Sequence, residues 1–185
     1  MEIQENISLK RFNTFGIDVI AKQLARFTSV DELHELLAYN QAQTANSKHQ
    51  TLILGGGSNL LFTGNVDGLV LKNEIPGIRE ISEDAHHVYV QAGAGVNWHQ
   101  FVLDCIGKGW AGVENLSLIP GNVGASPMQN IGAYGVEIKD VFYSLEALQN
   151  LEDIGPKVGG SIHHFFSNKN NITMLKELEE LGLQL

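Results

Sequence analysis

The chain has 185 residues, a formal net charge of −9 and 43% hydrophobic residues, which is typical of a soluble globular protein. Twelve lysines and arginines against 21 acidic residues disfavour nucleic-acid binding, which depends on basic side chains, but backbone amides can still hold a nucleotide phosphate. No apolar stretch approaches the roughly 18 residues of a membrane span, and the acidic N-terminus has no apolar run behind it, so we expect a cytoplasmic protein without a membrane partner.

The first expected elements in chain order are a loop over Asn13–Asp18 and a strand over Ala21–Phe27. Ser29–Glu32 is a capping box, because the serine hydroxyl can accept from the amide of the glutamate, whose carboxylate reaches back. The apolar positions that follow share one helical face, so the pattern predicts a helix here and a polar loop over Gln41–Gln50.

Three short strands are expected next. They cover Thr51–Leu54, Leu69–Leu71 and Val88–Ala92, and the Asp67-Gly68 pair is interpreted as a turn before the second. The third strand ends at Gly93-Ala94-Gly95, which we interpret as a strand-to-helix turn.

Asn97 is a candidate N-cap of a helix that Gly107 and Gly109 close. Its apolar positions follow a 3.6-residue stripe, namely Trp98, Phe101, Val102, Cys105 and Ile106. Cys105 is the only cysteine, which excludes a disulfide framework and a thiolate metal cluster.

The longest irregular segment runs from Asn115 to Gly135 and combines many glycines with scattered apolar residues. Loops of this length are usually functional or disordered, and the apolar content argues against disorder. A strand-like alternation follows over Val136–Leu148. After about Gln149 the composition changes, and Asn171 can cap a last helix over Ile172–Leu181.

Two glycine-rich loops are the strongest candidates for a binding site. Gly55–Asn59 follows a buried strand, and such a loop either cradles a phosphate with its backbone amides or is simply a tight turn. The sequence lacks the Gly-Lys-Ser/Thr of a P-loop and the third glycine of the dinucleotide fingerprint. With the second loop, Ile119–Gly135, the pair can close on the two ends of one extended ligand, such as a phosphate-linked cofactor with a flat ring.

These motifs together resemble a known family. The resemblance rests on Asn13–Ile17, Leu54–Leu61, Ala92–Gly95 with Trp98, and above all the stretch Glu114–Glu137 with its Pro-Gly and Tyr-Gly-Val-Glu signatures. In order and spacing the chain is similar to the UDP-N-acetylenolpyruvoylglucosamine reductase (UDP-N-acetylmuramate dehydrogenase) family over residues 1 to about 148.

The resemblance implies an α+β, FAD-binding fold of the vanillyl-alcohol-oxidase (PCMH) type with two α/β subdomains. They are expected at residues 1–68 and 69–148, the second one incomplete, followed by a divergent tail at 149–185. FAD is expected to bind non-covalently. The cofactor-binding residues that the resemblance implies are Gly55, Gly56, Gly57, Ser58, Asn59, Pro120, Gly121, Val123, Gly124, Ala125, Ser126, Gln129, Asn130, Gly132, Ala133, Tyr134 and Gly135.

In this family NADPH reduces the flavin, which then reduces a UDP-sugar enolpyruvyl ether, with a serine as proton donor and an arginine and a glutamate as stabilising groups. Ser161 is the candidate donor, since Gly159–Lys169 distantly echoes the family motif; chance similarity explains the echo equally well. The family arginine has no counterpart, because the only arginines are Arg11, Arg26 and Arg79. Family members are longer, so we expect a truncated chain.

Three functions therefore remain open: a reductase, a non-catalytic FAD-binding module, and a fragment in which the glycine loops are only turns. Metal binding is disfavoured, because the adjacent histidines His86-His87 and His163-His164 point in different directions on regular elements. We expect a monomer, in which a truncated sheet edge offers a surface for association.

Overall fold

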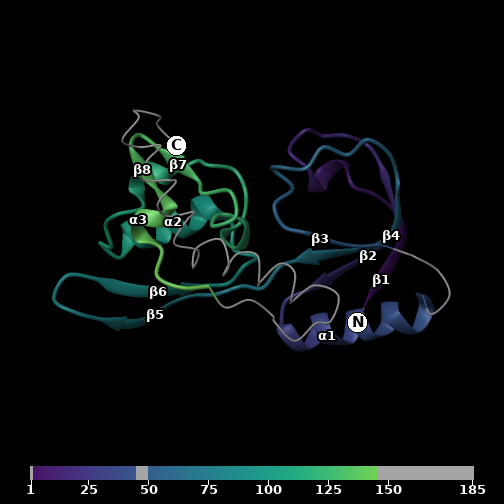
Figure 1. The fold of residues 1–185 in the computed structure, drawn as a ribbon, viewed down its shortest axis with the longest axis horizontal. Coiled ribbons are helices and arrows are strands. Elements are labelled where there is room, and N and C mark those ends of the chain that lie inside the picture. Colours follow the sequence, from purple (N-terminus) through teal and green to yellow (C-terminus); the bar gives the residue numbers. More distant parts are fainter. Residues whose placement is uncertain (1, 45–49, 146–185) are drawn as a thin grey trace, which may run out of the picture. The chain divides into compact units, whose positions relative to one another are not determined.

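A four-stranded sheet occupies the first half of the part that the computed structural model describes, residues 2–44 and 50–145. Its strands are β1 (Ile3–Ser8), β2 (Ile20–Phe27), β4 (Val66–Asn73) and β3 (Gln50–Leu54), in that spatial order (Figure 1). β1 is antiparallel to β2, whereas β2, β4 and β3 are mutually parallel. The carboxyl ends of the three parallel strands therefore share one edge, the edge at which ligands usually bind in open α/β sheets.

Helix α1 (Val30–Thr44) connects β2 to β3 and begins at the predicted capping signal. The hydroxyl of Ser29 accepts from the amide of Glu32 at 3.2 Å, and the Glu32 carboxylate accepts from the Thr28 amide at 2.6 Å. The return bond thus goes to the residue before Ser29. The helix continues to Thr44, so the predicted loop over Gln41–Gln50 is wrong at its start, and residues 45–49 lie outside the described part.

One face of the sheet buries a hydrophobic core that the N-terminal segment closes. Leu24, Leu54 and Val70 contribute from the strands, and Leu9 and Phe12 pack over them. Leu9 precedes a short 3-10 helix, η1 (Lys10–Phe12), whose last residue is Phe12. The core thereby holds the Asn13–Ile17 loop beside the carboxyl edge of the sheet.

The second half begins with an antiparallel hairpin of β5 (Ile78–Glu83) and β6 (Val88–Ala92). Helix α2 (Trp98–Gly107) follows, with Asn97 as the predicted N-cap: its side chain accepts from the Gln100 amide at 3.1 Å. Short elements complete this half, namely η2 (Glu114–Leu116), η3 (Val123–Ala125), β7 (Gly132–Ala133), β8 (Val136–Glu137) and α3 (Ile138–Val141).

A second core forms around Trp98, which is almost fully buried and donates from Nε1 to the carbonyl oxygen of Leu116 at 2.8 Å. Val102, Ile131 and Ile138 pack in the same cluster. Cys105 is buried there as predicted, and burial raises the pKa of its thiol. Ile106, predicted for the same stripe, is instead exposed, because it lies at the far edge of the buried face.

Several sequence predictions are wrong in detail. Of the strand expected over Val136–Leu148, the described part up to residue 145 is a strand only at Val136–Glu137, because Glu137 and Asp140 cap the short helix α3 reciprocally. Asp67 and Gly68 lie within β4 and form no turn. Strands β1 and β5 were not predicted at all.

The predicted division at residues 68 and 148 stays a prediction, although β4 continues from Val66 to Asn73 across the first boundary. The predicted helix over residues 172–181 and the Gly159–Lys169 motif lie outside the described residues. Across residues 2–44 and 50–145, no helix is long and apolar enough to cross a membrane.

Candidate functional site

The first glycine loop, Gly55–Asn59, begins where β3 ends at Leu54. Gly57 has φ +67°, and a side chain there would overlap the carbonyl oxygen of Phe12 and lie 3.0 Å from the Cα of Asn13. The Gly57 carbonyl oxygen accepts from the Thr14 amide at 3.1 Å. Glycine is required at this position, because both the backbone conformation and the close approach of the N-terminal segment exclude a side chain.

Asn13 fixes the N-terminal segment against this loop. Its buried side chain donates from Nδ2 to the carbonyl oxygens of Leu9 and Ile17 at 2.8 and 3.0 Å, and its Oδ1 accepts from the Ile17 amide at 3.0 Å. The amide side chain thus joins both ends of the Asn13–Ile17 loop. Sequence reasoning included Asn13 in a family motif without assigning it this structural role.

The two glycine loops meet at Gly56 and Gly121. A Cβ on Gly56 would lie 2.8 Å from the Cα of Gly121 and 3.0 Å from Oδ1 of Asn122. Gly121 has φ +129°, and a Cβ there would lie 2.9 Å from Oγ of Ser58. The structure therefore brings together segments 65 residues apart, through close contacts that only glycine permits at these two positions.

The Pro120–Ser126 segment is held against the turn that leads into α2. The amides of Val123 and Gly124 donate to the carbonyl oxygens of Val96 and Ala94 at 2.9 and 3.1 Å. Asn122, also buried, donates from its side chain to the Gly95 carbonyl oxygen at 3.0 Å. These hydrogen bonds to the turn hold the segment in place.

The Gly93-Ala94-Gly95 turn has a packing role. A side chain on Gly93 would overlap the carbonyl oxygen of Pro76, and one on Gly95 would overlap the backbone of Glu74. On its other side, a Cβ on Gly124 would lie 2.6 Å from the Cβ of Ala94. The turn is therefore enclosed between two backbone segments, which agrees with its interpretation as a strand-to-helix turn.

The backbone donors of the first loop have no partner within the described part of the chain. The amides of Gly56, Gly57, Ser58 and Asn59 donate no hydrogen bond to any described residue, and the side chains of Ser58 and Asn59 also have none there. A row of unpaired amides with a hydroxyl and a carboxamide beside it is a donor set that suits phosphate oxygens. The residues present therefore fit the pyrophosphate of FAD.

The Gln129–Gly135 stretch carries an unusual backbone. Ala133 and Val136 pair in the β7–β8 hairpin, so Tyr134 and Gly135 form its two-residue turn, with φ +53° and +79°. This combination is typical of a type I′ turn, which normally prefers Asn or Gly at its first position. Tyr134 is 90% exposed, so its ring does not pack within the loop.

Asn130 also has a left-handed backbone, with φ +39°, and its side chain donates to the Glu137 carboxylate at 2.9 Å. The Lys139 ammonium and this amide hold the pKa of Glu137 below its usual range. Together with Leu118, at φ +64°, three of the four left-handed non-glycine residues in the described chain lie between residues 118 and 134. Strained residues of this kind cluster at ligand sites.

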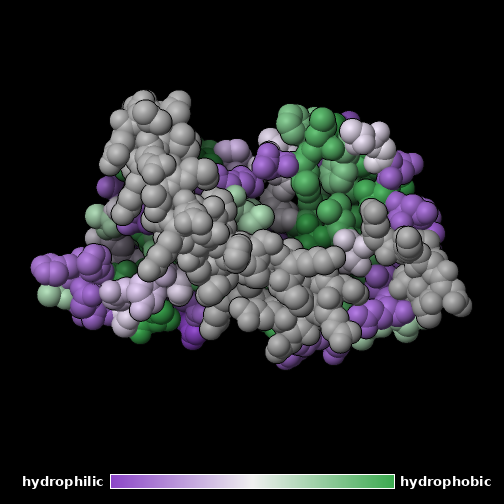
Figure 2. Space-filling view, viewed as in Figure 1, coloured by the Kyte–Doolittle hydropathy of each residue, from purple (hydrophilic) through white to green (hydrophobic). Residues whose placement is uncertain are grey.

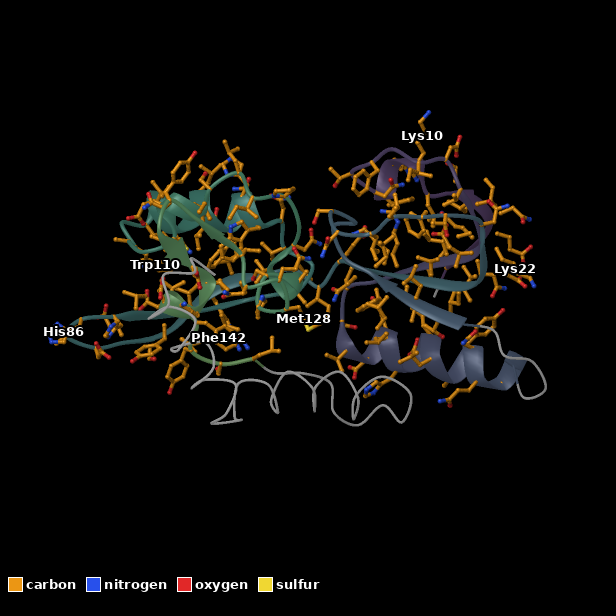
Figure 3. The ribbon with its side chains drawn as sticks, turned by 45° about the horizontal axis from the view of Figure 1, so that its top comes forward. Lys10, Lys22, His86, Trp110, Met128 and Phe142 are labelled. Atoms are coloured by element: carbon orange, nitrogen blue, oxygen red, sulfur yellow. The ribbon has the colours of Figure 1, made fainter. Side chains whose placement is uncertain are left out.

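Exposed apolar side chains accompany both loops. Leu61 follows the first loop in sequence, and Phe15 lies in the Asn13–Ile17 loop that contacts it. Leu118 directly precedes the second loop, and Met128 and Tyr134 belong to it. Figure 2 shows apolar residues gathered over the half that carries β1 to β4, and Figure 3 labels Met128. Exposed apolar surface beside unpaired amides suits a ligand with both a flat ring system and phosphates.

The predicted site residues are thus partly brought together. Gln129 lies with Pro120 and Ser126 around a small hollow of about 10 Å³, space for one water molecule. Ser161, the predicted proton donor, lies outside the described residues. Over residues 2–44 and 50–145, no cluster of three or more His, Cys, Asp or Glu side chains could hold a metal ion.

Comparison with known proteins places these loops in context. The UDP-N-acetylenolpyruvoylglucosamine reductase of Pseudomonas savastanoi pv. phaseolicola (strain 1448A / Race 6) is 55% identical over 148 residues, 80% of this chain and 42% of the relative. The enzyme of that name from Amoebophilus asiaticus (strain 5a2) is 52% identical over 151 residues, covering 80% and 43%. The chain thus spans less than half the length of these curated relatives, and the predicted resemblance is confirmed.

The fold is similar to the crystal structure of UDP-N-acetylenolpyruvylglucosamine reductase from Thermus caldophilus. The TM-score is 0.55 at 23% identity, over 76% of this chain and 46% of the other, and the likeness confirms the predicted α+β fold. A family described as FAD binding domain matches residues 21–152. Because this match covers well over half of the sequence, the chain belongs to the FAD binding domain family.

Proposed function

We propose that the chain binds FAD non-covalently, with the backbone amides of Gly56–Asn59 on its pyrophosphate and the Pro120–Gly135 segment along the rest of the cofactor. The observation that carries this proposal is the contact of two glycine loops beside a row of unpaired amides. An N–H donor needs no net positive charge, so this mode of phosphate binding suits a chain with a net charge of −9.

The rigidity of the first loop supports the same proposal. Gly57 is packed against Phe12 and Asn13, and Gly56 is packed against Gly121, so the amides of these two residues are fixed before any ligand arrives. Fixed donors lose little conformational entropy on binding, and preorganisation of this kind raises affinity. Ser58 and Asn59 add side-chain donors next to the same amides.

For the whole protein we propose the reaction in the name of its relatives: reduction of UDP-N-acetylglucosamine enolpyruvate, with NADPH as the reductant and UDP-N-acetylmuramate as the product. Bound FAD supplies hydride transfer in such a reaction. The protein's part is to bind and orient the cofactor, to exclude water from it, and to provide a proton, for which Ser161 remains the candidate.

A second candidate function is FAD binding without reductase activity. Its supporting observation is that the match to the FAD binding domain family, residues 21–152, contains both glycine loops, so their contacts account for cofactor binding without a substrate site. Both candidate functions predict the same flavin site in this polypeptide. They differ only in whether the protein turns over the UDP-sugar substrate.

The direct test is a titration of the purified chain with FAD in which quenching of flavin fluorescence reports binding. A titration with riboflavin is run in parallel. We expect FAD to bind at least tenfold more tightly, because riboflavin lacks the pyrophosphate. Equal affinities, or no binding of FAD, would refute the proposed phosphate site. Oxidation of NADPH that depends on the enolpyruvyl UDP-sugar then distinguishes the reductase from the binding module.

A matched pair of glycine variants tests the loop contact. Gly56→Ala places a methyl group 2.8 Å from the Cα of Gly121 and must push the loops apart, whereas Gly64→Ala places the same group in open space. We expect Gly56→Ala to weaken FAD binding at least tenfold and Gly64→Ala to leave it unchanged. If both variants bind FAD like the unmodified chain, the meeting of the loops is not part of the site.

A further inference from the structure

The first turn of α2 carries a histidine that contacts the two residues directly before the second loop. Nδ1 of His99 lies 3.0 Å from Oγ of Ser117 and 3.3 Å from the backbone nitrogen of Leu118. His99 is half-buried; its contact with Ser117 is partly buried, whereas its contact with Leu118 is exposed. The neighbouring Trp98 holds the same segment from the other side of the turn, through its bond to the Leu116 carbonyl oxygen.

The Leu118 contact assigns a role to Nδ1 of His99. A backbone amide can only donate, so Nδ1 must accept and must carry a lone pair. With Nδ1 as the acceptor in this contact, the ring proton is on Nε2. The Ser117 hydroxyl can rotate to donate to the same lone pair, whereas the Leu118 amide has no such freedom.

Leu118 is in a conformation that its own side chain does not favour. Its φ is +64°, and the left-handed region costs a leucine about 1–2 kcal/mol relative to the right-handed one. Its side chain is 75% exposed, so burial does not offset that cost. The conformation must be held by neighbouring contacts, and the bond from the Leu118 amide to His99 is the one that acts at this residue.

The path of the loop depends on this residue. Two residues separate Leu118 from Gly121, whose carbonyl oxygen accepts from the Trp98 amide at 3.0 Å and whose Cα packs against Gly56. The segment Leu116–Gly121 is thus held to α2 at its start, its middle and its end, and the middle bond belongs to His99. A change of conformation at Leu118 would redirect Pro120 and Gly121.

We propose that His99 is a positioning residue of the cofactor site: the Nδ1 lone pair holds Leu118 in the left-handed conformation and so places Gly121 against the first glycine loop. The inference rests on the proposed binding of FAD. It goes further by assigning a role to a side chain on α2, outside both glycine loops.

The experiment compares two amide replacements. In His99→Asn the carboxamide oxygen takes the place of Nδ1 and can accept from Leu118, whereas in His99→Gln the amide reaches the place of Nε2. His34→Gln is the control, on the exposed side of α1. We expect His99→Gln to weaken FAD binding at least fivefold, His99→Asn to recover most of that loss, and His34→Gln to have no effect. Equal effects of the two His99 variants would overturn the proposal.

A second measurement separates this inference from the proposed function. In the unmodified apo protein labelled with 15N, a scalar coupling across the hydrogen bond is expected between the Leu118 amide nitrogen and Nδ1 of His99, with the ring proton on Nε2. Its absence would overturn the positioning role, whether or not FAD binds. If the coupling is present and the unmodified chain binds no FAD, the proposed function fails and the cofactor role of His99 fails with it.

Discussion

Gly57 separates two effects that usually occur together, backbone strain and steric overlap. It has φ +67°, and a Cβ there would overlap the carbonyl oxygen of Phe12. Gly16 has nearly the same φ, +65°, but open space around its Cβ position. The pair therefore allows the cost of the overlap to be measured apart from the cost of the left-handed conformation.

We expect Gly16→Ala to lower the free energy of unfolding by about 1 kcal/mol, the cost of a left-handed alanine. Gly57→Ala should lower it by about 2–5 kcal/mol, because the overlap adds the cost of an overpacked site. Urea denaturation of the two variants measures both values. Similar losses for the two variants would mean that the Phe12 segment moves aside at little cost.

Asn13 is a second residue whose role can be measured directly. Asn13→Ala removes three hydrogen bonds and leaves the carbonyl oxygens of Leu9 and Ile17 without this partner, so we expect a loss of about 2–4 kcal/mol in the free energy of unfolding. Asn65→Ala is the control, since Asn65 is exposed and makes one bond, to the Ile20 amide; its loss should stay below about 1 kcal/mol.

At the scale of elements, the sequence predicts correctly those helices and strands that carry a strong local signal, and it misses those whose signal is weak. Helix α2 combines an N-capping asparagine with a regular apolar stripe, and both are local properties of the sequence. Strand β5 is exposed at nearly every position, so it lacks the apolar alternation by which a strand is recognised. Gly68 looked like a turn residue, but in β4 it is buried, and burial depends on tertiary packing.

The candidate site shows the same limit. The resemblance indicated which glycine-rich segments belong to the site, because family motifs are read along the chain. It could not indicate that Gly57 faces Phe12 or that Gly56 faces Gly121, since these contacts join distant segments. His99 carried no signal, because one histidine on a helix is not a motif, and only its 3.3 Å distance from the Leu118 amide reveals a role.

The tip of the β5–β6 hairpin, where Figure 3 labels His86, contains a carboxylate with an unusual titration. The Asp84 carboxylate accepts from the amides of His86 and His87, both at 2.8 Å, and from the Tyr89 hydroxyl at 3.0 Å. These bonds, first that from the His86 amide, lower the pKa of Asp84 to about 2. The native pKa thus lies below the value of about 3.9 for an unfolded aspartate.

Because its pKa is lowered in the native state, the Asp84 carboxylate adds to the free energy of unfolding above about pH 4. This contribution is lost as the pH falls through about 2. We expect Asp84→Ala to remove this dependence, so that its stability differs from that of the unmodified chain at pH 5 and approaches it near pH 2. Urea midpoints at several pH values measure the effect, with Glu83→Gln as the neighbouring control. A constant difference over this range would contradict the assignment.

At the scale of the whole molecule, the arrangement of two cores explains why the site forms where it does. The core under the four-stranded sheet includes Phe12, and the core around α2 includes Trp98. Phe12 contacts the first glycine loop, and the backbone amide of Trp98 holds the second. Each loop is therefore anchored to its own core, so the amides of the first loop stay in place without a bond to another part of the described chain.

This anchoring leads to a prediction for the stability of the molecule. A ligand that binds only the folded state adds RT ln(1 + [L]/Kd) to the free energy of unfolding, about 2.7 kcal/mol at a hundredfold excess over Kd. We expect FAD to raise the thermal midpoint accordingly, and riboflavin at the same concentration to raise it much less, because it cannot use the amides of Gly56–Asn59. ADP, which carries the pyrophosphate without the flavin ring, should raise the midpoint by an intermediate amount. A shift of equal size with riboflavin would place the binding energy in the ring contacts instead of the phosphate loop.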